Sequence, residues 1–217
     1  KNRQTKIIAI VALVVAIVGM SLGFAAFSNI LTISSSATVT PNKDDFKVLF
    51  SGDDDDPYDT VLKGLYQNRP GKGYIIAEDA IIVNEGDVSS TQPKVTFTDP
   101  GQVAVYYVYA HNVGNYTAYL NKLEFNNVQG TELKKVCTPL EGATPELVTA
   151  ACESIELVVK FGGNDYRDTR EFSGINIDIG EYVYGMLWIE YLSDGARADG
   201  PFTVEFGDVK LYFSTVD

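Results

Sequence analysis

The feature that most constrains this chain is an uncharged stretch of 21 residues near its start, Ile7–Phe27. Twelve of these residues are Ile, Val, Leu or Phe, and no charged residue follows until Lys43. As a helix the stretch would be ~31 Å long, which matches the hydrocarbon core of a bilayer. Lys1, Arg3 and Lys6 precede it, and positive residues favour the cytoplasmic side. The sequence therefore predicts a membrane-spanning helix, with the rest of the chain exported.

Three uses of this stretch compete: a cleaved signal peptide, a lasting anchor, and a helix that packs against copies of itself. Ala25 or Ala26 offers a small residue at which a signal peptidase could cut. The apolar core of a signal peptide is only about 7–15 residues long, however, and this stretch is longer. We therefore expect a retained helix.

Small residues in the stretch recur at spacings of three and four, which places them on one helical face. These residues are Ala9, Ala12, Ala16, Gly19, Gly23 and Ala26. Gly19 and Gly23 form a GxxxG pattern, which lets two helix backbones approach closely. We predict that this face is a helix-packing seam between copies of the chain.

The chain is expected to divide into residues 1–28, which hold the charged start and the helix, and residues 29–217, which form one exported domain. The whole chain carries a net charge of −12, and because the first six residues carry three positive charges, the remainder carries −15. A nucleic-acid partner is therefore not expected, since it would need a basic face. An acidic surface suits a soluble domain outside the cell.

Cys137 and Cys152 are the two cysteines of the chain. In an exported protein an even pair predicts a disulfide. A metal site is the weaker alternative, because no histidine or further cysteine lies near enough in the sequence to complete it. We predict a disulfide and no metal site.

The stretch Ile30–Thr40 follows the apolar stretch almost directly and alternates with a period of two. Its mostly apolar face consists of Leu31, Ile33, Ser35, Ala37 and Val39. Such alternation predicts a long strand with one buried face. We consider it as a strand that could leave its own domain and pair with a neighbouring copy.

Strand patterns separated by turn residues cover most of the remaining chain. Strands are expected at about 46–51, 80–84, 94–98, 102–113, 116–127, 154–161, 182–192, 202–206 and 209–213. The strands at 102–113 and 116–127 are predicted to be neighbours or a hairpin, joined by a turn at Gly114-Asn115. The strand at 182–192 is apolar on both faces and is expected to be central. Phe206 and Val209 are three residues apart, so an unbroken strand would place their side chains on opposite faces. Gly207-Asp208 therefore marks a bulge or a tight turn.

One short helix is expected outside the N-terminus, at 145–152, with Thr144 as its N-cap and Pro145 at its first position. The stretches around 52–73 and 162–174 are expected to be loops. The predicted fold is an antiparallel β-sandwich of immunoglobulin-like or jelly-roll type, preceded by one long hydrophobic α-helix.

Asp53–Asp56 and Asp59 raise the possibility of a calcium site. The spacing, glycine and terminal glutamate of an EF-hand loop are absent from this stretch. We therefore interpret the aspartates as a solvated acidic loop.

Residues for catalysis are scarce. His111 is the single histidine, so a Ser-His-Asp arrangement would have one candidate base, at the junction of a strand and a turn. The sequence has no HExxH, phosphate-binding glycine loop or Gly-x-Ser-x-Gly motif. We predict no enzymatic activity, no catalytic residues, no cofactor and no small-molecule substrate. Asn115 begins an Asn-Tyr-Thr glycosylation sequon.

The segment GFAAFSNILTISSSATVTP resembles the start of exported fibre subunits of the TasA/camelysin type, and HNVGNYTAYL resembles that family's Asn-x-Gly turn. The resemblance implies a jelly-roll domain and extracellular filaments in which an N-terminal strand completes a neighbour's sheet. It also implies removal of the apolar leader. In layout the chain is similar to type IV pilins, whose helix is retained in the filament core, although Lys1 and Thr5 stand where bacterial pilins carry Phe and Glu.

Both resemblances predict a structural subunit of an extracellular cell-surface filament. Its partners would be copies of itself, and the membrane before assembly. The alternative is a single-pass, membrane-anchored surface domain that binds or adheres.

Overall fold

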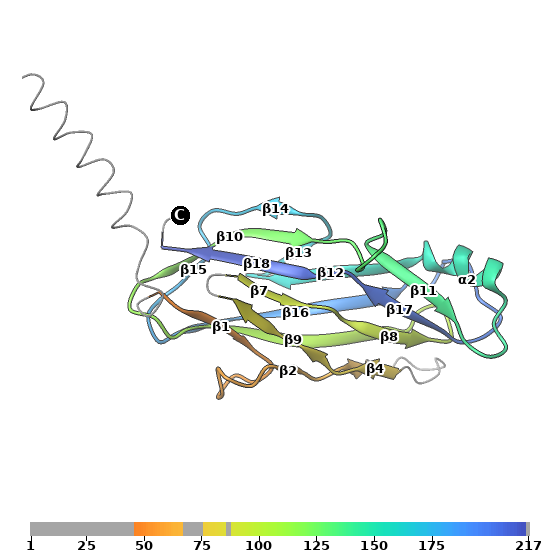
Figure 1. Ribbon diagram of the computed structural model, residues 1–217, viewed down its shortest axis with the longest axis horizontal. Coiled ribbons are helices and arrows are strands. Elements are labelled where there is room, and N and C mark those ends of the chain that lie inside the picture. Colours follow the sequence, from red (N-terminus) through yellow and green to blue (C-terminus); the bar gives the residue numbers. More distant parts are fainter. Residues whose placement is uncertain (1–45, 67–75, 86–87, 216–217) are drawn as a thin grey trace, which may run out of the picture. The chain divides into compact units, whose positions relative to one another are not determined.

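A computed structural model describes residues 46–66, 76–85 and 88–215 (Figure 1). These residues belong to one compact unit, Lys43–Asp217. The predicted helix Ile7–Phe27, its seam and the predicted strand Ile30–Thr40 lie outside the described residues. The described part is mainly β, with antiparallel sheets, as the sequence predicts.

The first layer is a six-stranded antiparallel sheet in the order β1-β9-β16-β12-β13, with β3 also paired to β9. The strands are β1 (Val48–Ser51), β9 (Val103–Asn112), β16 (Tyr182–Tyr191), β12 (Ile155–Phe161), β13 (Asn164–Tyr166) and β3 (Leu65–Tyr66). The predicted central position of β16 is confirmed, because β9 and β12 flank it. Its two faces are not equally buried: Leu187, Ile189 and Tyr191 face the core, while the alternate side chains are half-buried or exposed.

The second layer consists of two sheets joined end to end. One has the order β14-β10-β18-β7-β6, with β15 also paired to β10, and the other has the order β11-β17-β8-β4. Because β7 leads into β8 and β17 leads into β18, the two sheets share continuous strands. Their bounds are β14 (Arg170–Glu171), β10 (Ala118–Phe125), β18 (Val209–Ser214), β7 (Val88–Thr91), β6 (Val83–Glu85), β15 (Asn176–Ile177), β11 (Lys135–Pro139), β17 (Phe202–Phe206), β8 (Lys94–Phe97) and β4 (Ile76–Glu78).

The core lies between the two layers. Phe50 of β1 contacts Phe213 of β18, with ring centroids 5.5 Å apart. Tyr191 of β16 is fully buried and meets Phe97 of β8 and Phe202 of β17 edge to face, at 5.9 and 5.6 Å. Such aromatic pairs each contribute about 0.5–1.5 kcal/mol beyond their buried area. These contacts join the first layer to both sheets of the second.

Tyr106 of β9 is also fully buried, and its hydroxyl lies 2.8 Å from Glu78 O and 2.9 Å from Lys94 O. Burial raises the pKa of this phenol, which therefore stays neutral. The hydroxyl links the first layer to β4 and β8.

Gly207 and Asp208 interrupt one long strand. Of the two alternatives predicted at this point, a bulge and a tight turn, the structure has the bulge. β17 and β18 continue in line and pair with β8 and β7 in turn. A Cβ atom on Gly207 would lie 2.0 Å from Asn126 O, so only glycine fits here. The bulge shifts the alternation of side chains between the two faces of the strand, so both Phe206 and Val209 are buried.

The prediction that the strands at 102–113 and 116–127 are neighbours is wrong. β9 pairs with β1, β3 and β16 in the first layer, whereas β10 pairs with β14, β15 and β18 in the second. Gly114 does not adopt a left-handed φ, which a tight hairpin turn of the common kind would need. Instead, the Asn112 amide donates to Tyr116 O and Ile177 O, at 2.7 and 2.9 Å, and supports a crossing between the layers.

Several short strands depart from the predicted boundaries. The predicted loop at 52–73 contains β2 (Val61–Leu62) and β3, and the predicted loop at 162–174 contains β13 and β14. The predicted strand at 80–84 is divided into β5 (Ala80–Ile81), which pairs with β2, and β6. β7 is an unpredicted strand, because its sequence Val-Ser-Ser-Thr has a weak apolar pattern.

The single helix in the described part of the chain is α2 (Pro145–Cys152), at the predicted position. Thr144 is its N-cap residue, but the predicted side-chain cap is absent. The Thr144 hydroxyl donates instead to Asp199, at 2.6 Å, and this bond lowers the pKa of that carboxyl. None of the described helical structure is long and apolar enough to cross a membrane.

Candidate functional site

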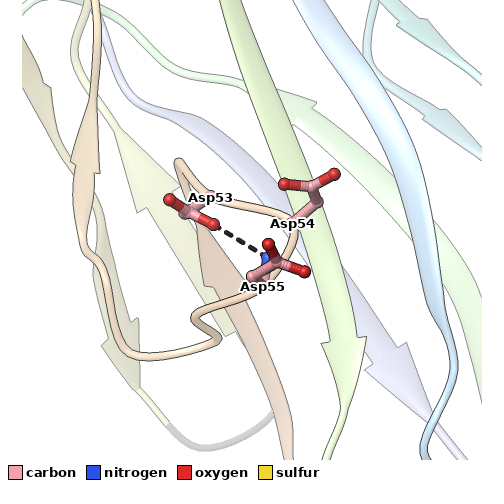
Figure 2. A group of neighbouring side chains, drawn as sticks. All are labelled: Asp53, Asp54 and Asp55. Atoms are coloured by element: carbon pink, nitrogen blue, oxygen red, sulfur yellow. Dashed lines mark hydrogen bonds between the residues drawn. The ribbon is translucent and has the colours of Figure 1, made fainter.

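The acidic loop after β1 brings three carboxylates together (Figure 2). Oxygen atoms of Asp53, Asp54 and Asp55 lie within 4.8 Å of one another. Asp53 Oδ1 accepts hydrogen bonds from Asp55 N at 2.8 Å and Asp56 N at 3.3 Å. An aspartate that binds the backbone two or three residues ahead is a turn former. These turns account for the local backbone geometry, and the interpretation as a solvated acidic loop stays a prediction.

His111 is buried beside the same loop. Its Nε2 atom lies 3.0 Å from Ser51 Oγ and 3.0 Å from Asp53 O. Ser51 is itself fully buried. Through these contacts Ser51 and His111 anchor the loop to β9.

Cys137 of β11 and Cys152 of α2 form the predicted disulfide, with Cα atoms 6.0 Å apart. The bond closes a loop with a sequence separation of 15 residues. It fastens the end of α2 to an edge strand of the second layer, and β12 begins three residues after Cys152.

Replacing both Cys137 and Cys152 by serine is expected to lower the free energy of unfolding by ~3 kcal/mol, because a loop of this length is no longer closed in the unfolded chain. Chemical denaturation of the oxidised protein and of the double variant would measure the difference. The native protein should also resist thiol alkylation at both positions. Ready alkylation of either cysteine would contradict the assignment.

A groove of about 540 Å³ opens between the two layers beside this disulfide. Its walls come from both layers and from α2, and its apolar lining includes Phe125, Leu133, Val136, Ile155, Leu157 and Phe206. Core strands normally close such a space with side chains. Here the sandwich stays open along one side.

The wall from the second layer is an open strand edge. β11 is the last strand of its sheet and pairs only with β17 among the described residues. Gly207 N donates to Lys134 O at 3.0 Å. Because backbone groups alternate in an antiparallel pair, those of Lys135 and Cys137 point away from β17. They have no strand partner in the described part of the chain.

The opposite wall is also partly open. Leu192 N donates to Ser154 O at 2.9 Å. By the same alternation, the backbone N–H and C=O groups of Ile155 and Leu157 in β12 point away from β16. β13 covers only Val159–Phe161 of that edge. The first half of β12 therefore faces the groove with a strand edge that lacks a strand partner in the described part of the chain.

Charged side chains surround the groove. Lys135 crosses it, and its Nζ donates to Ile155 O. Burial lowers the pKa of Lys135, while Glu153 and Glu156 oppose this shift. At the rim, Arg167 Nε lies 3.3 Å from Glu156 Oε2. The groove thus has a largely apolar lining, one lysine that crosses it and an ion pair at its mouth.

A second feature lies on the outer surface of the first layer. β9 and β16 place a group of aromatic side chains there, which we call the tyrosine face: Tyr107, Tyr109, His111, Tyr182 and Tyr184. Tyr184 lies directly opposite Tyr109, and Tyr182 lies directly opposite His111. The neighbouring residues in β9, including Tyr106 and Val108, point into the core.

The rings of the tyrosine face form one continuous surface. Tyr184 lies 5.7 Å from Tyr107 and 5.6 Å from Tyr109 between ring centroids, and Tyr182 lies 5.7 Å from Tyr109. Tyr182 and Tyr184 are 46% and 43% exposed. Large aromatic side chains are seldom left on a surface in such a cluster without a binding role.

Asn115 lies in the exposed connection between β9 and β10. Its position leaves the predicted glycosylation sequon on the surface, and modification stays a prediction. The helix-packing seam at Ala9, Ala12, Ala16, Gly19, Gly23 and Ala26 lies outside the described residues.

Sequence reasoning missed both the groove and the tyrosine face. Tyr107 and Tyr109 are two residues apart, as are Tyr182 and Tyr184. This spacing was a signal for the face, because it places both members of each pair on one side of a strand. The groove had no comparable local signal, since its walls belong to strands from different layers.

Comparison with known proteins found no matching family model, no similar curated protein and no similar solved structure.

Proposed function

We propose that this chain is a structural subunit of an extracellular filament, in which the segment Ile30–Thr40 of one copy lies in the groove of the next copy. The observation that carries the proposal is the groove between β11 and β12, which has an unpaired strand edge on β11, a partly unpaired one on β12 and a largely apolar lining that the Lys135 side chain crosses. The segment has a complementary character, with one mostly apolar face and a second face of Thr and Ser. Adding an extended segment to an exposed sheet edge is a common mode of peptide recognition.

The reach of the chain limits which part of the segment could lie in the groove of its own copy. Thr40 precedes Val48 by eight residues, so even a fully extended chain spans at most ~28 Å between them. Val48 lies opposite Asn112, whereas Leu157 aligns through Ile189 with Ala104. Eight residues along β9 and three strand spacings across separate the two sites by ~30 Å. Figure 1 likewise shows β1 beginning at the end of the domain opposite α2. Thr40 thus barely reaches this part of the groove in its own copy, whereas Ile33, fifteen residues before Val48, is long enough in reach for its own groove or a neighbour's. Crosslinking between copies distinguishes the two.

The stretch Ile7–Phe27 would span the membrane before assembly and pack in the filament core afterwards. The domain would be an antiparallel β-sandwich of immunoglobulin-like or jelly-roll type on the outside. Its acidic surface supports solubility in that position. No enzymatic activity, cofactor or small-molecule substrate is part of this proposal.

Negative-stain microscopy of material sheared from cells that produce the full chain tests the proposal. Filaments labelled by an antibody against the domain are the expected result. Recovery of the protein only as detergent-soluble monomers or dimers would contradict it.

The seam gives a further expectation. Gly19→Leu or Gly23→Leu should reduce filament yield, because a large side chain prevents close approach and typically costs ~1–3 kcal/mol in a packed contact. Membrane targeting should be unchanged, since leucine is at least as apolar as glycine. Met20→Leu, off the seam, is the matched control. Normal filament yield and diameter in both glycine variants would exclude the helix from the core.

The second candidate function is a membrane-anchored surface domain that binds a partner. The exposed tyrosine face favours it, because such a surface is not required by the fold of β9 and β16. The microscopy described above separates the two candidates.

A further inference from the structure

We propose that the tyrosine face binds a segment of a partner polypeptide rich in arginine and lysine. The proposal does not rest on the filament assignment. The face lies on the outer surface of the first layer, whereas the groove lies between the layers, so both could be occupied at once.

The face is built on two adjacent strands of the first layer, β9 and β16, which pair with each other along its whole length. β1 also pairs with β9 at Tyr109 and His111, whereas β12 pairs with β16 only from Gly185 onward. The rings therefore project from a rigid support, and little conformational entropy is lost when a ligand covers them. Tyr182 and Tyr184 on β16 are the more exposed part of this surface, and Tyr107 and Tyr109 lie half-buried beside them on β9.

The charge around the face favours a cation. Aromatic rings carry a negative electrostatic potential on their faces. The loop after β1 places Asp53 and Asp54 near Tyr109, and their charge adds to burial in raising the pKa of that phenol. Glu181 precedes Tyr182 and is exposed. A cationic side chain over these rings would meet both a ring face and a nearby carboxylate.

The basic groups that share the neighbourhood are already engaged. Lys160 lies over the ring of Trp188, 4.8 Å from its centroid, and 3.4 Å from Asp165 Oδ2. Lys47, at the start of β1, lies over Tyr58 at 5.6 Å. Lys160 and Trp188 are on the same outer surface as Tyr184, so this surface already holds one cation against an aromatic ring.

Other classes of partner fit less well. A nucleic acid or an acidic peptide would be repelled by the carboxylates at Asp53 and Asp54. A second copy docked face to face would bring two acidic loops together. Arginine suits the face best, because its planar guanidinium stacks on aromatic rings and pairs with carboxylates.

Binding of a fluorescent peptide of alternating arginine and glycine to the immobilised full-length protein tests the proposal. The double variant Tyr182→Ser/Tyr184→Ser is expected to weaken binding about tenfold, as the loss of two exposed cation–π contacts predicts. Tyr116→Ser is the matched control, because Tyr116 is 48% exposed but lies outside the face, and it should bind normally. Near-ultraviolet circular dichroism would verify that all variants are folded.

A charge-matched pair separates local from general attraction. Asp53→Asn/Asp54→Asn should weaken binding, whereas Glu132→Gln/Glu141→Gln, with the same change in net charge, should not. Equal weakening by both pairs, or full binding by the tyrosine variant, would overturn the proposal. Displacement of the peptide by a neutral soluble polysaccharide, with no effect of the aspartate variant, would also overturn it and identify the face as a sugar-binding surface.

Discussion

Ile33→Asp is expected to abolish filament formation while the thermal unfolding of the domain stays unchanged. Ile33 lies on the apolar face of the segment Ile30–Thr40, and in the proposed assembly that face enters the groove lined by Ile155 and Leu157. An unpaired carboxylate placed there would cost several kcal/mol at every contact between subunits. The yield of filaments sheared from cells and the melting curve of the full-length protein in detergent would measure the two effects.

Ser34→Asp is the matched control for this variant, because Ser34 occupies the opposite face of the segment and would remain towards solvent. It should assemble with nearly normal yield. Equal assembly of both variants would remove the segment from the interface. Equal failure of both would show that the segment tolerates no added charge on either face, which is contrary to the proposed orientation.

Tyr191→Ala is expected to lower the free energy of unfolding by ~3–5 kcal/mol or more, the largest loss of any single substitution considered for the domain. The ring is fully buried and contacts Phe97 and Phe202 from the facing layer. Its hydroxyl donates to Ala196 O at 2.6 Å and accepts from Ala198 N at 3.1 Å. Removing the side chain leaves a cavity and two backbone groups without their partner. Chemical denaturation would measure the loss.

Tyr191→Phe separates these contributions. It keeps the ring contacts and removes only the hydroxyl, so the expected loss is about 1–3 kcal/mol, as for a buried group that loses its hydrogen bond. A loss as large as that of Tyr191→Ala would place most of the stabilisation in the hydroxyl. No loss in either variant would contradict the description of this part of the core.

Local patterns in the sequence predicted much of the domain because the physical causes are local. Alternation of apolar residues identified β9, β16 and β17–β18, since a strand that buries one face must repeat every two residues. The change of parity at Gly207 located the break between β17 and β18. Pro145 and the apolar residues after it located α2. The cysteine count predicted the disulfide.

Relations between distant strands were harder to predict. Gly114-Asn115 resembles a hairpin turn, yet β9 and β10 lie in different layers because both edges of β9 are already paired, with β1 and β3 on one side and β16 on the other. The groove depends on the same long-range arrangement. β11 and β12 are close in sequence, but α2 and the disulfide hold them in opposite walls. The tyrosine face depends on β9 lying beside β16, about 70 residues later.

Crosslinking between differently tagged copies tests the proposed assembly most directly. Cells would produce two full-length chains together, one carrying Ile33→Cys and the other carrying Leu157→Cys, each with the native disulfide retained. After treatment with a bismaleimide, the proposed arrangement predicts a covalent pair that contains both tags. A third chain that carries both substitutions would be treated in the same way by itself. An internal crosslink in that chain, with no covalent pair between the two tagged chains, would contradict the proposed arrangement.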